Sequence, residues 1–176
     1  MSDVLTHGAG RADAILLRHA HRAANNQTAL TEIAELALAT APTRERLHEA
    51  TGQGNAFVLA ASPWNASVLT TLAQTVDAIA YPIAVGAMAG AHDVPEDAAC
   101  AGMLQAFAAN LISAAVRLVP LGQSAGLAVL AALEPTILAI TAETRTATLD
   151  DLGGAAFRSD LAAMRHETQY TRLFRS

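Results

Sequence analysis

Apolar residues recur along the chain with the spacing of α-helices. Within residues 28–40, Leu30, Ile33, Ala34, Ala37 and Leu38 follow this spacing. Intervals of three or four residues place these side chains on one helix face. The same spacing predicts helices over residues 11–24, 43–61, 66–78, 82–90, 95–118 and 127–133, and a last helix that Ser159 or Asp160 would cap. The strict alternation typical of a half-buried strand is absent, so the pattern predicts an all-α fold.

Prolines, glycines and polar clusters separate the predicted helices. Pro63 ends one helix and Pro82 opens another, because proline is tolerated in the first turn and disrupts later ones. Pro95, followed by two acidic residues, suits the start of the longest helix. Pro135 is expected to kink or restart the helix that follows. Residues 144–157, "TRTATLDDLGGAAF", are predicted to form a loop.

Composition agrees with the helical pattern and adds an expectation about packing. The 176 residues include 42 alanines, and aromatic residues make up only 4% of the chain. Alanine is the best helix former and is depleted from strands. Alanine and glycine dominate the stretch "AVGAMAGA", residues 84–91, where two helices should approach closely. We expect residues 1–176 to form one domain, a bundle of roughly seven to eight helices.

Charge and cysteine content limit the functional classes. The net charge is −5, which does not favour nucleic-acid binding, and the sequence contains no lysine. A chain without lysine cannot form a Walker A phosphate loop or a lysine Schiff base. Cys100 is the single cysteine, so no internal disulfide can form, and the N-terminus lacks the pattern of a signal peptide. These features predict a cytoplasmic protein.

One uncharged stretch raises the alternative of a membrane span. Residues 98–116 carry no charge and are long enough to cross a bilayer. Polar residues and a glycine interrupt the stretch, and much of the rest is weakly hydrophobic alanine. The central helix of a soluble bundle is the favoured interpretation, so no membrane association is expected.

Histidines and nucleophiles show no catalytic pattern. His19 and His21 are two residues apart, which places them on different faces of a helix, so they cannot chelate one ion. His166 and Glu167 resemble the start of a zinc-protease motif, but the second histidine of that motif is missing. Cys100 lies among small residues, as a buried cysteine does. The chain is therefore expected not to be an enzyme and to hold no resident cofactor or metal.

Two stretches combine residues suited to recognition or to unusual packing. Arg117 ends an apolar helix in "LISAAVRLVPLGQSAG", where an arginine needs water, a carboxylate or free carbonyls. The C-terminal segment 164–176, "MRHETQYTRLFRS", joins arginines to aromatic residues, which are enriched at protein interfaces. The segment is either a partner site or a terminal helix that docks on its own bundle through Leu173 and Phe174.

These two stretches resemble the signature motifs of the urease accessory protein UreF family. "RL-x-PLGQ" occurs at residues 117–123, and "HETQY-x-RLFRS" ends the chain at residues 166–176. Weaker matches are "DAILLRHAHRAA", "TRERLHEATGQGNAF" and "YPIAVGAMAGAHDVP". The resemblance covers essentially the whole chain. A further N-terminal region with a proline- and glycine-containing motif is usual in the family, and nothing here matches it.

The resemblance implies an all-α, homodimeric, non-enzymatic chaperone of urease maturation. Family members bridge UreD, also called UreH, and the nickel-carrying GTPase UreG on apo-urease, and nickel passes transiently through the complex. By resemblance, the partner-binding residues are Arg165, His166, Glu167, Gln169, Tyr170, Arg172, Leu173, Phe174, Arg175 and Ser176. The central motif comprises Arg117, Leu118, Pro120, Leu121, Gly122 and Gln123. Within it we expect Arg117 to hold the core and the Gly122–Gln123 turn to lie inside, near the tail.

Several alternatives stay open at this point. Without the usual N-terminal motif, the chain could be a helical protein–protein interaction module that no longer acts in urease activation. Arg172 or Arg175 could act in trans on GTP as an arginine finger, although arginines paired with acidic partner residues are more common. Transient contact of nickel with His48, His92 or His166 is also open.

Overall fold

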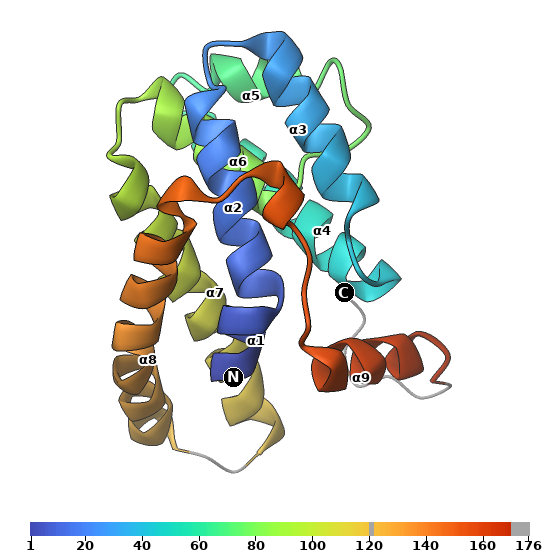
Figure 1. Cartoon of the computed structure of the whole chain (residues 1–176), viewed down its shortest axis with the longest axis vertical. Coiled ribbons are helices and arrows are strands. Elements are labelled where there is room, and N and C mark those ends of the chain that lie inside the picture. The colour runs from blue at the N-terminus through green and yellow to red at the C-terminus, as the bar shows by residue number, and fades with distance from the viewer. Residues whose placement is uncertain (120–121, 170–176) are drawn as a thin grey trace.

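The structure, a computed structural model, describes residues 1–119 and 122–169. These residues form nine α-helices and two short 3₁₀ helices without a β-strand, which confirms the all-α class (Figure 1). The helices are α1 (Ser2–His7), α2 (Ala9–Arg22), α3 (Gln27–Ala39), α4 (Arg44–Ala61), α5 (Ser67–Leu72), α6 (Tyr81–Ala91), α7 (Glu96–Leu118), α8 (Gln123–Glu143), η1 (Thr144–Thr146), η2 (Leu149–Asp151) and α9 (Phe157–Glu167).

Helix α2 runs through the middle of the bundle, between α6, α7 and α1 (Figure 1). Every residue of its run "DAILLR", residues 13–18, is buried. Gly86 and Gly90 allow α6 to pack closely against it, because a Cβ atom at these positions would overlap the carbonyl oxygens of Leu17 and His21, respectively. The close helix contact predicted for "AVGAMAGA" is thereby confirmed.

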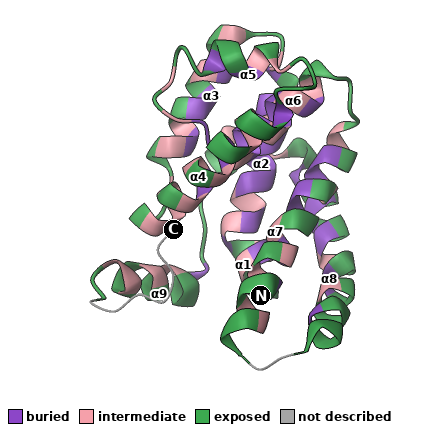
Figure 2. Ribbon diagram, turned by 180° about the vertical axis from the view of Figure 1, so that it is seen from behind, coloured by how far each residue is buried: buried purple, intermediate pink, exposed green. Residues whose placement is uncertain are grey.

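Two apolar clusters make up the core, and α2 contributes to both. The first joins α2 to α3, α5 and α6, with Leu30, Leu69 and Ile83 fully buried. The second joins α1 and α2 to α7 and α8, with Leu17 and Leu104 fully buried. Since burying one such side chain contributes about 1.5–3 kcal/mol, the two clusters fix α2 as the axis of the fold. Figure 2 shows buried positions concentrated on α2 and the helices beside it.

Helices α7 and α8 form an antiparallel hairpin whose tip extends beyond the rest of the bundle (Figure 1). Gly126 lets the two helices meet near the tip, since a Cβ atom there would lie 3.1 Å from Ile112 and Val116. Helix α8 continues through Pro135, so the expectation of a restart at this proline is wrong. Pro135 is exposed, and water can satisfy the carbonyl that loses its partner.

The two hairpin helices are also relevant to the alternative that part of the chain spans a membrane. Helix α7 and the segment Gln123–Thr146 are each long and apolar enough to cross a membrane. Core helices of soluble bundles have the same length and composition, so this property alone is weak support for a span. In the structure α7 buries Cys100, Met103 and Leu104 against its neighbours, as expected for a packed central helix.

Helix boundaries differ from the sequence-based expectations at several places. Helix α8 spans Gln123–Glu143, well beyond the predicted range 127–133. No pattern predicts α1, which is only one turn and a half long and buries a single residue, Leu5. Helix α5 ends well before the predicted limit of residue 78. Helix α9 begins at Phe157 without a cap from Ser159 or Asp160, because the preceding Ala156 is buried and fixes the start of the helix.

Candidate functional site

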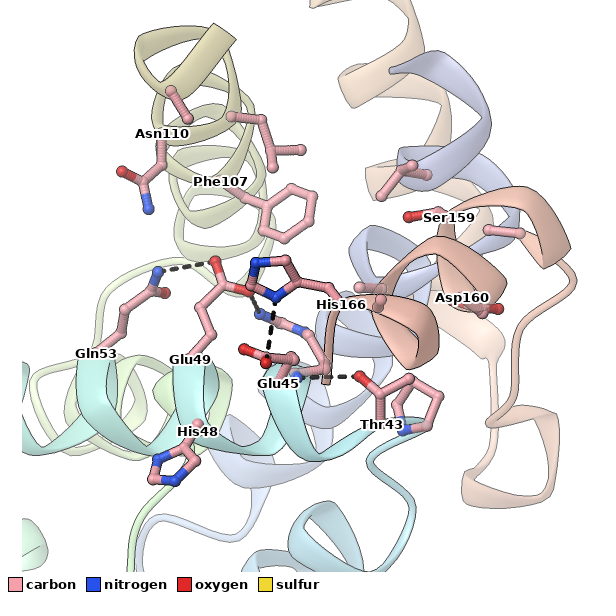
Figure 3. Close-up of a pocket in the computed structure, with 18 of the residues that line it drawn as sticks. Thr43, Glu45, His48, Glu49, Gln53, Phe107, Asn110, Ser159, Asp160 and His166 are labelled. Carbon is pink, nitrogen blue, oxygen red and sulfur yellow. Dashed lines mark hydrogen bonds and ion pairs between the residues drawn. The ribbon is translucent and has the colours of Figure 1, made fainter. Parts of the chain in front are cut away.

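Helix α9 rests on the first turn of α4 and lies outside the core (Figures 1 and 3). No residue of α9 itself is buried. The Nδ1 atom of His166 lies 3.2 Å from Oε1 of Glu45, and the backbone N–H of Arg44 donates to Oε1 of Glu167 over 2.8 Å. A carboxylate is favoured at this end of a helix by the free N–H groups and by the helix dipole. Polar contacts therefore hold the C-terminal end of α9.

A cleft of about 890 Å³ separates α4, α7 and α9. Helix α7 supplies an apolar wall with Phe107, Leu111 and Leu118. The polar side of the cleft is formed by Glu45, Arg46, Glu49, Gln53, Ser159, Asp160 and His166. In Figure 3 the side chains of Glu45, Glu49 and His166 converge, whereas His48 points away from them. The fold thus brings three segments that are distant in sequence to one surface depression.

Arg46 anchors the polar side of the cleft. It pairs with Asp13 of α2 and with Glu49 at 2.9 Å, and Glu49 accepts a hydrogen bond from Gln53 at 3.2 Å. Its guanidinium also lies 5.5 Å from the centre of the Phe107 ring, within cation–π range. Burial raises the pKa of Asp13 to about 6, although Arg46 opposes the rise. This network ties α4 to α2 and α7 and so sets the shape of the cleft.

The outward face of α9 is apolar, contrary to the usual arrangement of a surface helix. Phe157, Leu161 and Met164 are 74%, 50% and 50% exposed, and their spacing places them on one stripe. Arg158 and Arg165 flank this stripe, are exposed, and form no ion pair within the described part of the chain. An exposed apolar stripe with charged neighbours is typical of a protein-binding surface.

A second polar cluster ties α2 to the hairpin. Arg18, only 1% exposed, pairs with Glu96 and with Asp97 at 2.7 Å, and donates to the hydroxyl of Thr144 over 3.1 Å. Arg145 also binds Asp97, at 2.6 Å. Hydrogen bonds from Arg145 and Arg18 lower the pKa of Asp97 to about 2. Because its partners come from α7, α8 and η1, Arg18 is the arginine that holds the core.

Arg117 does not hold the core, so that expectation is wrong. Its side chain is exposed near the end of α7 and forms no ion pair among residues 1–119 and 122–169. The helical period explains the difference: Ile112 and Val116 face Gly126 of α8, and the next position turns toward solvent. One arginine is buried as expected, but it is Arg18 and not the residue that the sequence pattern indicated.

The rest of the central motif lies at the hairpin tip. Leu118, Gly122 and Gln123 are exposed, so the expectation that the turn lies in the interior is also wrong. Pro120 and Leu121 lie outside the described residues. The described residues of the motif are therefore displayed on the surface.

The predicted tail residues that the structure describes differ in direction. His166 and Glu167 face α4, Gln169 lines the cleft, and Arg165 faces solvent. The remaining positions lie outside the described residues and their roles stay predictions: Tyr170, Arg172, Leu173, Phe174, Arg175 and Ser176. Sequence reasoning missed the stripe on α9 because it placed Phe157 in a loop, although the spacing to Leu161 and Met164 is a helical signal.

Histidines and carboxylates do not gather here as the ligands of a metal site would. Within the described segments, no group of three or more His, Cys, Asp or Glu side chains is arranged to hold a metal ion. His19 and His21 bond separately to the backbone carbonyls of Ala147 and Val94, at 3.1 and 2.7 Å. This agrees with the expectation that the two histidines lie on different faces of α2.

Comparison with known proteins relates these surfaces to a family. The UreF family model matches residues 1–134. A urease accessory protein UreF of Rhodopseudomonas palustris strain BisB18 is 49% identical over 180 residues, which covers 100% of this chain and 75% of the relative. This chain belongs to the UreF family. The resemblance of the sequence motifs is thereby confirmed.

Other UreF proteins show the same extent of similarity. The urease accessory protein UreF of R. palustris strain TIE-1 is 50% identical over 177 residues, covering 98% of this chain and 74% of the relative. That of Bradyrhizobium sp. strain ORS 278 is 48% identical over 179 residues, covering 100% and 75%. The similarity to UreF proteins therefore includes α9 as well as the core.

Proposed function

We propose that this UreF family member acts in urease maturation as a non-catalytic scaffold. The observation that carries the proposal is the outward face of α9, an apolar stripe flanked by two arginines that leads directly into the C-terminal motif. An apolar face directed away from its own bundle gains stability only when another surface covers it. This face therefore supports a function in protein–protein contact.

The UreF family implies which proteins make this contact. In our proposal the chain bridges UreD, or UreH, and the GTPase UreG on apo-urease, and it regulates GTP-dependent nickel insertion in the cytoplasm. The α9 stripe and the C-terminal motif supply one binding surface, and the exposed hairpin tip with Arg117 supplies a second. Nickel is the cargo of this assembly, and the chain positions the proteins that carry and receive it.

The family also implies a homodimer. Two exposed apolar side chains of α8, Leu127 and Leu138, support this part of the proposal. They are eleven residues apart, which places them on one helix face, with Glu134 between them, and this face is offered to a second copy.

The test combines partner binding with urease activation. We expect the full chain to bind UreD and UreG and to restore urease activity to cells that lack their own UreF. Deletion of residues 165–176 should abolish both. The double variant Leu161→Ser/Met164→Ser, with the C-terminal motif intact, should weaken UreD binding about tenfold or more, since buried apolar anchors dominate interface energy.

A matched control uses Leu59→Ser. Leu59 is 77% exposed near the other end of α4, so this variant changes an equally apolar surface position away from α9 and should bind as the wild type does. If the full chain binds neither partner and restores no urease activity, the scaffold proposal is wrong. The chain would then be an interaction module outside urease activation.

A further inference from the structure

His166 and Glu167 point toward their own chain, although the family motif includes them among partner-binding residues. His166 lies 3.2 Å from Glu45, and Glu167 accepts the backbone N–H of Arg44 at 2.8 Å. We infer that these contacts form a latch, made by His166 and Glu167 on α9 and by Glu45 and the Arg44 N–H on α4, which positions α9 for partner binding. The part that concerns binding rests on the proposed function.

Among the described residues, polar contacts attach α9 at two places, of which the latch is one. The other is the segment before the helix, where the backbone N–H of Ala155 donates to the carbonyl of His7 over 2.6 Å and Ala156 is buried. Gly153 precedes this anchor with φ +138°, a conformation that favours glycine. Between anchor and latch, no residue of α9 is buried. Within the described part of the chain, α9 without the latch is therefore attached mainly at its start.

The side of α9 that lines the cleft is mainly polar and has Ala163 as its small apolar side chain, so apolar packing contributes little beside the latch. Ser159, Asp160 and His166 line the cleft from this side, whereas Phe157 and Leu161 point outward. Apolar burial gives a helix most of its stability in a protein. Since α9 has little such burial, its orientation depends on the contacts at the N-terminus of α4. A helix N-terminus favours the Glu167 carboxylate through both its free N–H groups and its dipole.

The latch prepares α9 for a partner and does not block it. In the latched position Phe157, Leu161 and Met164 remain at least half exposed, so the partner surface is not covered. A helix held in its binding orientation loses less conformational freedom when the partner arrives. If only a fraction of molecules is latched, the apparent affinity falls by that fraction. His166 and Glu167 are thus positioning residues.

The experiment first measures hydrogen exchange of the free protein. We expect Glu167→Ala and Glu45→Ala to accelerate amide exchange in α9 about tenfold, because each removes one of the two contacts of the latch, while exchange in α2 is unchanged. Glu32→Ala, an exposed acid on α3, is the matched control and should leave α9 exchange unchanged. Unchanged exchange in both latch variants would overturn the inference.

Binding to purified UreD then tests positioning against direct contact. Latch loss should weaken UreD binding about tenfold in Glu45→Ala as well as in Glu167→Ala, and the double variant should be little weaker than either. If Glu167→Ala weakens binding and Glu45→Ala does not, Glu167 contacts the partner and the positioning role is wrong.

Tighter binding in the latch variants would also overturn the positioning role, because the latch would then be inhibitory. If the wild type does not bind UreD, the proposed function fails, and the exchange data still decide whether the latch exists.

Discussion

At the scale of single residues, the position of an arginine on its helix decides its role. Arg18 and Arg117 both follow apolar residues, and both are followed by residues of a helix. Arg18 faces acidic residues at the start of α7, while Arg117 has turned past the seam of the hairpin into solvent. Two residues of the same type in similar local sequence therefore have opposite burial, and their substitutions should differ in consequence.

Arg18→Ala should destabilise the protein by about 1–3 kcal/mol, because the buried hydroxyl of Thr144 loses its donor while Glu96 and Asp97 each keep a second arginine as partner. Arg117→Ala should change the free energy of unfolding by less than about 0.5 kcal/mol, as is usual for an exposed residue without partners. Urea denaturation followed by circular dichroism measures both. Equal effects of the two variants would contradict the assignment of Arg18 to the core.

Asp13 should give the folded protein a measurable pH dependence. Burial raises its pKa from 3.8 to about 6, so the folded state holds the proton more tightly than the unfolded chain does. Protonation therefore favours the folded state fully below about pH 4, and this contribution is lost as the pH rises through about 6. Relative to Asp13→Asn, the wild type should lose on the order of 2 kcal/mol between about pH 4 and pH 7.

Urea denaturation of the wild type and Asp13→Asn across this pH range tests the sign. A difference between the two proteins that stays constant, or that grows in favour of the wild type as the pH rises, would show that Asp13 ionises as an ordinary exposed carboxyl group does.

At the scale of elements, glycine permits the closest helix pair and weakens other helices. Gly86 faces the backbone of α2, with no room for a methyl group, whereas a methyl group on Gly102 of α7 would have no neighbour within 4 Å. The two glycines lie in helices of similar composition. Because their surroundings differ, substitutions at the two glycines separate the effect of packing on stability from the effect of intrinsic helix propensity.

Gly86→Ala should destabilise the protein by about 1–3 kcal/mol, since the new methyl group overlaps the carbonyl of Leu17 and forces α6 away from α2. Gly102→Ala should stabilise it by about 0.5–1 kcal/mol, because alanine loses less conformational entropy in a helix. Thermal and urea unfolding of the two variants make the comparison. A stabilised Gly86→Ala variant would mean that α2 and α6 do not pack this closely.

At the scale of the whole molecule, the apolar core and the surfaces proposed for partner binding lie in different parts of the chain. The two apolar clusters meet on α2 and involve α1 to α8. Two segments project from this core, the tip of the α7–α8 hairpin and helix α9 (Figure 1). The central family motif lies at the first projection, and the C-terminal motif begins on the second. Substitutions in such segments should have little effect on the core.

The local sequence pattern is sufficient to predict most helices of this protein, because helical spacing, proline and alanine act within a few residues of sequence. It also identifies the close contact at residues 84–91, since small side chains permit such contact wherever they occur. The directions of Arg18, Arg117, His166 and Glu167 depend instead on which helices become neighbours. Residues more than 70 positions apart meet at Arg18 and at the α9 latch, at separations of 78 and 121 residues. No local pattern encodes those pairings, because they arise only when the apolar clusters bring α2, α7 and α8, or α4 and α9, together.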